Sequence, residues 1–154
     1  MGPWLWLKVN RKMPTIRFAL RPIEVLLVFV GGCAGTASRL AVSLALPQHG
    51  SIPVAILLIN ISGAFALGWL LTSLSARGRE TPRRKNLRLL LGTGFMGGFT
   101  TYSALATDAM LLFGQGSAAA ALAYGLGTVV LGAVATWFGM LAGARRTSSS
   151  GGAK

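Results

Sequence analysis

Acidic residues, cysteine and histidine are scarce in this sequence, and each shortage narrows what the chain can do. Only three of its 154 residues are acidic (Glu24, Glu80 and Asp108), and charged residues make up 12% of the chain, about half the share found in soluble domains. Cys33 and His49 are the only residues of their types, so no internal disulfide and no Cys/His metal cluster can form. We assign no chemistry to either residue and expect no enzymatic activity.

The Lys and Arg residues number fifteen and give a net charge of +12, which in a soluble protein would suggest nucleic-acid binding. Here they are not gathered into one basic face but lie between long apolar runs. Positive residues that flank apolar runs are typical of membrane proteins. We therefore expect a lipid bilayer, and no nucleic acid, as a partner of this chain.

Four apolar stretches are long enough to cross the hydrocarbon core of a bilayer, which takes about 20 mostly apolar residues. They are Ile23–Leu46, Ile52–Leu74, Leu87–Phe113 and Ala118–Ala142. Tight turns at 47–51 and 114–117 make the helices on either side of them antiparallel neighbours. The predicted fold class is an all-α membrane protein with four transmembrane helices in an up-down-up-down bundle.

The membrane domain lies between two short polar ends. We expect a basic N-terminal extension at 1–22, a four-span membrane domain at 23–143 and a flexible C-terminal tail at 144–154. Fourteen of the fifteen Lys and Arg residues fall on one side of the bundle, and the exception is Arg39. By the positive-inside rule this side is cytoplasmic, so both termini should face the cytoplasm.

The first span carries a glycine pair and an arginine. Gly31 and Gly35 are four residues apart and share a helix face, so another backbone can approach closely there. Arg39 lies well inside the span, where a charge is costly and needs a partner. That partner is either a carbonyl, in a structural role, or a watery vestibule that attracts anions, and the sequence leaves both open.

Asn60 lies near the middle of the second span, in the run Ile59–Gly63. Its NH₂ group donates two hydrogen bonds and carries no charge. Such a group suits an anion that must be stripped of water and still be released. A hydrogen bond between helices would satisfy the same amide, so an ion pathway and helix packing are equal alternatives for Asn60.

The third span contains the stretch Gly94–Ser103, with three glycines and two threonines in ten residues. This composition predicts a helix broken near its middle. Backbone groups freed at membrane depth must be buried and satisfied, by protein or by an ion. Carbonyls that point into a dry centre suit a hard cation such as Na⁺, and the alternative is a kink that allows close packing.

The fourth span carries two hydroxyl side chains, Tyr124 and Thr128, four residues apart. This spacing puts them on one helix face, where they can line one side of a polar track. Hydroxyls on an apolar helix also bond back to their own backbone, and the spacing does not separate the two alternatives.

Together these stretches resemble the CrcB/Fluc family of bacterial fluoride channels. The resemblance covers roughly Glu24 to Gly143 and is carried by three motifs. They are a GGxxGxxxR stretch at Gly31–Arg39, an Asn-to-glycine small-residue run at Asn60–Phe65, and a GFxGGxTTxS block at Gly94–Ser103. The function implied is passive export of fluoride from the cytoplasm across the bacterial inner membrane, which reduces fluoride toxicity.

The resemblance also implies an assembly, an antiparallel dimer with two fluoride pores along its interface and a structural Na⁺ at its centre. The backbone carbonyls of Gly97 and Thr100 would hold the Na⁺. The fluoride pathway would be lined by Asn60, Tyr102, Ser103, Leu105, Tyr124 and Thr128.

Two positions depart from the family pattern, in which two phenylalanines present electropositive ring edges to the anion. Tyr102 keeps an aromatic edge but adds a hydroxyl, and Leu105 has no ring. The second subunit is either a copy of this chain or a related partner. The missing ring and the one-sided Lys/Arg bias favour a heterodimer, because one gene supplies both orientations only when that bias is near neutral.

Two other functions fit parts of the sequence. A small four-span proton-coupled cation or drug exporter needs a carboxylate deep in a span, whereas Glu24 lies at the start of the first span and Asp108 near the end of the third. A non-conducting partner subunit of a heteromeric channel would account for the lost ring at Leu105.

Overall fold

The computed structural model describes residues 21–46, 53–75 and 80–148, and this part of the chain is almost entirely helical. The elements are α1 (Pro22–Ala45), α2 (Val54–Ser75), α3 (Pro82–Leu87), η1 (Arg88–Met96), α4 (Gly97–Phe99), α5 (Tyr102–Gly114) and α6 (Ala118–Ser148). Of these, η1 is a π-helical stretch that continues α3 and runs into α4 without interruption. The predicted all-α class is confirmed.

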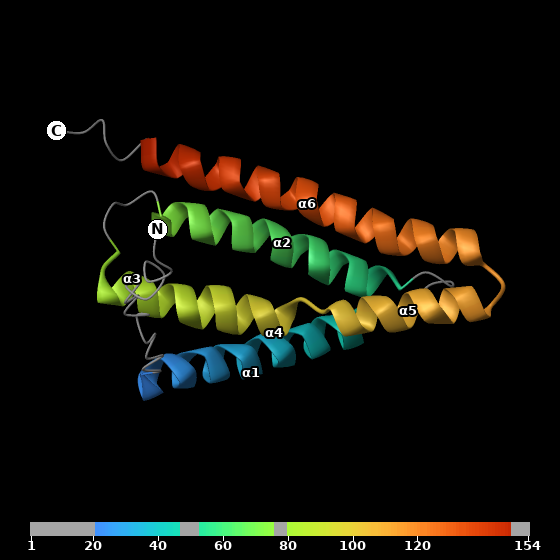
Figure 1. The fold of residues 1–154 in the computed structure, drawn as a ribbon, viewed down its shortest axis with the longest axis horizontal. Helices are drawn as coiled ribbons and strands as arrows, with labels where there is room; N and C mark the ends of the chain where they lie inside the picture. The colour runs from blue at the N-terminus through green and yellow to red at the C-terminus, as the bar shows by residue number, and fades with distance from the viewer. Residues whose placement is uncertain (1–20, 47–52, 76–79, 149–154) are drawn as a thin grey trace, which may run out of the picture.

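Three helices in the described residues, α1, α2 and α6, are long and apolar enough to cross a membrane. The third predicted span is not one continuous helix, because Thr100 and Thr101 are extended, with ψ angles of 154° and 124°. Figure 1 shows α4 and α5 following one another along the bundle on either side of this break. The protein is therefore a multi-pass membrane protein whose third predicted span is interrupted inside the glycine- and threonine-rich stretch.

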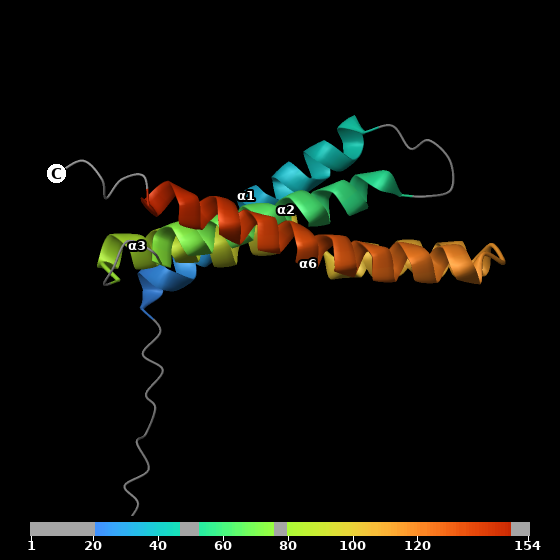
Figure 2. The ribbon, with the colours of Figure 1, turned by 90° about the horizontal axis from the view of Figure 1, so that it is seen from above.

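The helices pack as two closely associated sets. α2 lies against α6, α1 lies against η1 and α4, and α5 packs on α6. Figure 2 shows that α1 crosses the other helices at an angle, so that its last turns diverge from α5 and α6. α1 and α3 begin, and α2 and α6 end, at the same end of the bundle (Figure 1), which is the predicted up-down-up-down order.

Glycines allow the close contact between α1 and the third span. A Cβ atom at Gly31 would meet the carbonyl oxygen of Leu90, and one at Gly35 would meet the carbonyl oxygen of Phe95. Gly139 allows the same close backbone contact between α6 and α2, because a Cβ atom there would meet the α2 backbone. Lipid is as apolar as the helices, so close backbone packing is a main source of helix association in a bilayer. The close approach predicted for Gly31 and Gly35 is confirmed.

The two ends of the chain extend beyond what the structure describes. The predicted N-terminal extension falls almost wholly on 1–20, and the first turn, with His49, falls on 47–52, both outside the described residues. At the other end α6 continues to Ser148, past Gly143, where the sequence places the end of the membrane domain. The rest of the predicted tail, 149–154, lies outside the described part.

Candidate functional site

The break between α4 and α5 diverts two backbone donors from their helical acceptors. The N–H of Thr101 donates to Asn60 Oδ1 at 2.8 Å, and the N–H of Ala104 donates to Thr101 Oγ1 at 3.2 Å. In a continuous helix these donors would bond to the carbonyls of Gly97 and Thr100, four residues earlier. The same Asn60 amide also donates through Nδ2 to the Thr101 carbonyl at 3.0 Å. The break thus leaves the carbonyls of Gly97 and Thr100 without these two helical donors, while Asn60 bonds to both backbone groups of Thr101.

The freed carbonyls of Gly97 and Thr100 fit the role that the resemblance implies for them. Gly97 is exposed, and a Cβ atom there would meet no atom of the described residues within 4 Å. Carbonyl oxygens are ligands that hard cations prefer. The neighbouring Gly98 packs against Gly32 of α1, so the close packing is at Gly98, and Na⁺ binding at Gly97 and Thr100 stays a prediction.

Arg39 reaches the same break from α1. Its Nε donates to the carbonyl oxygen of Gly98 at 3.3 Å, and Thr36 Oγ1 donates to the same oxygen at 3.4 Å. In a continuous helix this oxygen would accept from the N–H of Tyr102. The partner of Arg39 is therefore a carbonyl, one of the two alternatives left open by the sequence, and its role in a vestibule stays a prediction.

An open groove of about 320 Å³ runs between α2, the helix break and α6. Four of the predicted pathway residues line it: Asn60, Tyr102, Leu105 and Thr128. Tyr102 is 82% exposed, whereas Leu105 and Thr128 are buried. A second hollow of about 310 Å³ between α5 and α6 shares Tyr102 and Leu105 with the groove. These residues come from three separate helices, and the fold places them on one face.

The other two predicted pathway residues lie beside this groove. Ser103 is exposed, and its Oγ lies 3.2 Å from Thr101 Oγ1. Tyr124 is buried like Thr128, one turn away on α6, and Thr128 Oγ1 donates to the Tyr124 carbonyl at 2.6 Å. The Thr128 hydroxyl is thus bonded to its own helix while its side chain still lines the groove.

Asp108 is not among the predicted pathway residues, but the structure gives it a partner there. The Tyr124 hydroxyl lies 3.3 Å from Asp108 Oδ2 and 3.3 Å from the carbonyl oxygen of Pro53, and can donate to either. Asp108 also lines a hollow of about 180 Å³ with Ser43. The sequence does carry a signal for Asp108, because an acidic residue inside an apolar span marks a functional site by default.

Thr136 lines the groove beside Asn60, and the sequence interpretation missed it. Its Oγ1 donates to the carbonyl of Gly132 at 2.9 Å and lies 3.3 Å from the carbonyl of Ala64 on α2. Thr136 lies eight residues after Thr128, so the period of four that relates Tyr124 to Thr128 extends to it. Continuing that period along α6 would have identified it.

Comparison with known proteins shows the family of this chain. Residues 26–140 match the family described as CrcB-like protein, Camphor Resistance (CrcB). A relative named fluoride-specific ion channel FluC 2, from Leifsonia xyli subsp. xyli, is 47% identical over 79% of this chain and 83% of its own length. One named fluoride-specific ion channel FluC 1, from Cutibacterium acnes, is 42% identical over 76% of this chain and 82% of its own. The chain therefore belongs to the CrcB/Fluc family, as its three sequence motifs predict.

Proposed function

We propose that this chain is a subunit of a fluoride-selective channel and that the groove at the helix break lines its pathway. The observation that carries the proposal is the gathering of the Asn60 amide, the Tyr102 ring and the Thr128 hydroxyl on one face between α2 and α6. The lining residues include no charged side chain. The names of the relatives, fluoride-specific ion channels, support the choice of ion.

A channel selective for a small anion must replace its hydration shell with dense hydrogen-bond donors. Asn60 Nδ2 uses one hydrogen on the Thr101 carbonyl and carries a second one, because an amide has two. The edge of the Tyr102 ring is electropositive and adds a weak anion contact. Donors without a fixed positive charge bind the anion and still allow its release. Passage along such donors is passive, and it requires no enzymatic chemistry.

A second subunit is needed to complete this pathway. The groove is open along one side, and Tyr102 is largely exposed on the subunit surface. Lipid tails can offer no hydrogen bonds to polar groups at this depth. In an antiparallel dimer the groove would be closed by protein, and the carbonyls of Gly97 and Thr100 would meet their counterparts around a Na⁺ ion at the centre.

The second subunit is a related chain of opposite orientation rather than a copy of this one. Leu105 is buried beside Tyr102 and offers no ring to the pathway, so a partner with an intact aromatic pair would complete one pore. Of the basic residues in the described part of the chain, all but Arg39 lie near the helix ends that share one end of the bundle: Arg21, Arg83, Arg84, Lys85, Arg88, Arg145 and Arg146. The numbers 1 and 2 in the names of the relatives fit paired channels.

The direction of transport follows from the membrane potential. With the basic end and both termini in the cytoplasm of a bacterial inner membrane, an inside-negative potential favours anion exit by about 2.3 kcal/mol per 100 mV. Fluoride that enters as neutral HF and ionises in the cytoplasm therefore leaves through the channel, which reduces its toxicity.

Growth on fluoride tests this function in cells. A bacterium that lacks its own fluoride channel is given this chain together with a related chain of opposite Lys/Arg bias, and intracellular fluoride is measured. We expect growth at fluoride concentrations that stop the parent strain, with lower intracellular fluoride. Growth unchanged from the parent, with both chains present in the membrane, would contradict the proposal.

A further inference from the structure

A separate groove lies far from the helix break, among residues near the starts of α1 and α3 and the end of α2. Figure 1 shows that these helix ends share one end of the bundle. The volume of the groove is about 680 Å³, and it crosses the start of the third span between α1 and α2. Its lining is mixed. The apolar part includes Leu27, Leu87 and Leu90, and the polar part includes Arg83, Arg84 and Asn86.

This end of the molecule has more positive than negative charge. The chain has three acidic residues, and two of them form ion pairs here. Lys85 Nζ lies 2.6 Å from Glu24 Oε1, and Arg88 Nη2 lies 2.9 Å from Glu80 Oε1. The third, Asp108, lies in α5, on the other side of the helix break. The two acids are thus engaged by Lys85 and Arg88, and the arginines of α3 add further positive charge.

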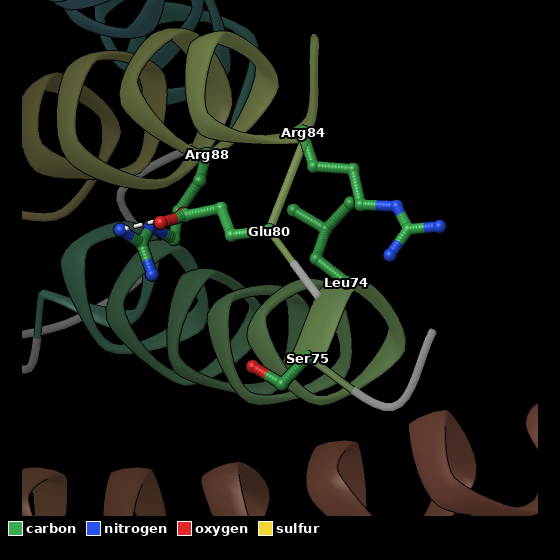
Figure 3. A pocket seen from close by; sticks show the side chains of 5 residues that line it. All are labelled: Leu74, Ser75, Glu80, Arg84 and Arg88. Carbon is green, nitrogen blue, oxygen red and sulfur yellow. Dashed lines mark ion pairs between the residues drawn. The ribbon is translucent and has the colours of Figure 1, made fainter. Parts of the chain in front are cut away.

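Both of these α3 arginines, Arg83 and Arg84, line the groove, and Arg84 also lines a smaller hollow that it shares with Glu80 and Arg88. Figure 3 shows Glu80 turned toward Arg88, while the Arg84 side chain extends past Leu74 in the opposite direction. Arg83 is exposed and lines the same groove as Arg84. The groove therefore brings two guanidinium side chains next to a leucine-lined floor.

The position of this groove limits what can occupy it. The ends of transmembrane helices lie at the membrane interface, where lipid headgroups meet the first carbons of the acyl chains. An occupant that matches the lining must be anionic toward Arg83 and Arg84 and apolar toward Leu27 and Leu90. Basic pockets between transmembrane helices are a recurring type of site for anionic headgroups.

We propose that this groove binds one anionic phospholipid, with the headgroup phosphate at Arg83 and Arg84 and the start of an acyl chain along Leu27 and Leu90. Arginine suits this task because its planar guanidinium binds phosphate oxygens in a bidentate manner. A lipid held there contacts α1, α2 and α3 together, so it stabilises the charged end of the bundle. This site is independent of the fluoride pathway.

The test uses the intact protein in neutral detergent with three probes: phosphatidylglycerol, phosphatidylcholine with the same acyl chains, and inorganic phosphate. Native mass spectrometry measures bound lipid, and thermal unfolding measures Tm. We expect one phosphatidylglycerol to bind and raise Tm, whereas phosphatidylcholine and inorganic phosphate leave it unchanged. Phosphatidylcholine that binds equally well, or inorganic phosphate that reproduces the Tm shift, would overturn the proposal, and neither comparison needs a variant.

A matched pair of variants localises the site. Arg83→Gln combined with Arg84→Gln should weaken phosphatidylglycerol binding by about 10- to 30-fold, since each basic residue near an anionic surface changes the affinity by about fivefold. Arg145→Gln combined with Arg146→Gln also removes two charges at the same end, but on α6, whereas no α6 residue lines the groove, and this variant should leave binding unchanged. Equal loss in both variants would show diffuse attraction by surface charge instead of a site.

Discussion

The side-chain amide of Asn60 forms two hydrogen bonds with the backbone of Thr101. Its Oδ1 accepts from the Thr101 N–H at 2.8 Å, and its Nδ2 donates to the Thr101 carbonyl at 3.0 Å. Each backbone group left without a partner at membrane depth costs several kcal/mol. One residue therefore stabilises the break in the third span and also lines the groove that the break opens.

Asn60→Asp should abolish fluoride flux while leaving a folded protein. An aspartate can still accept from the Thr101 N–H but cannot donate to its carbonyl, and its negative charge repels the anion in the groove. Fluoride efflux and size-exclusion chromatography of the purified variant measure both effects. Ser62→Ala is the matched control, because the Ser62 hydroxyl donates within its own helix, to the Ile59 carbonyl. Normal flux through Asn60→Asp would contradict an ion-pathway role for Asn60.

Removal of Na⁺ should weaken the dimer or stop flux. The carbonyls of Gly97 and Thr100 lose their helical donors at the break, and a cation bound between two subunits would compensate them. Replacing Na⁺ by the much larger N-methyl-D-glucamine, with the anion composition unchanged, is the test. If neither the dimer nor the flux responds to cation identity, the break serves only close packing.

Gly35→Ala should destabilise the protein by about 1–3 kcal/mol, the usual cost of overpacking. The added methyl group would run into the carbonyl oxygen of Phe95, and backbone cannot move aside as a flexible side chain can. Gly114→Ala is the control, since a Cβ atom there meets nothing within 4 Å. Thermal unfolding of both variants in one detergent measures the difference, and equal Tm values would mean that α1 can shift to accommodate the methyl group.

The sequence was sufficient to predict the elements that depend on composition and spacing. Long apolar runs predicted the spans, the Gly31–Gly35 spacing predicted the contact between α1 and the third span, and the stretch Gly94–Ser103 predicted the break. What it could not supply was the partner of each polar group. Spacing alone does not show that Asn60 bonds to the backbone of Thr101, since these residues are 41 positions apart.

The sequence carries a local signal for some other features, but only part of their structure follows from it. The start of α3 at Thr81–Pro82 combines an N-cap threonine with a proline in the first turn, a common helix start, yet the third span was predicted to begin at Leu87. The depth of Asp108 in the third span follows from the sequence, but its hydrogen-bond partner Tyr124 does not. The π-helical stretch η1 has no sequence pattern by which it could be predicted.

Expressed alone, the chain should insert in one orientation, with its termini in the cytoplasm. Each basic residue near an anionic cytoplasmic surface contributes about 1 kcal/mol, and fourteen of the fifteen fall on one side by sequence. A reporter fused to the C-terminus, active only in one compartment, measures the orientation. Roughly equal amounts of both orientations, with full fluoride flux, would replace the heterodimer by a dual-topology homodimer.

Fluoride efflux from liposomes tests the central claim most directly, that the groove beside Asn60 is part of a fluoride pathway. The purified chain is reconstituted alone and with a related chain of opposite Lys/Arg bias, and fluoride and chloride release are followed with ion-selective electrodes in the absence of a proton gradient. We predict passive fluoride release, without chloride release, that is weak for the chain alone, strong with the partner and abolished by Asn60→Asp. No fluoride release in either preparation, or cation transport that requires a proton gradient, would contradict the account.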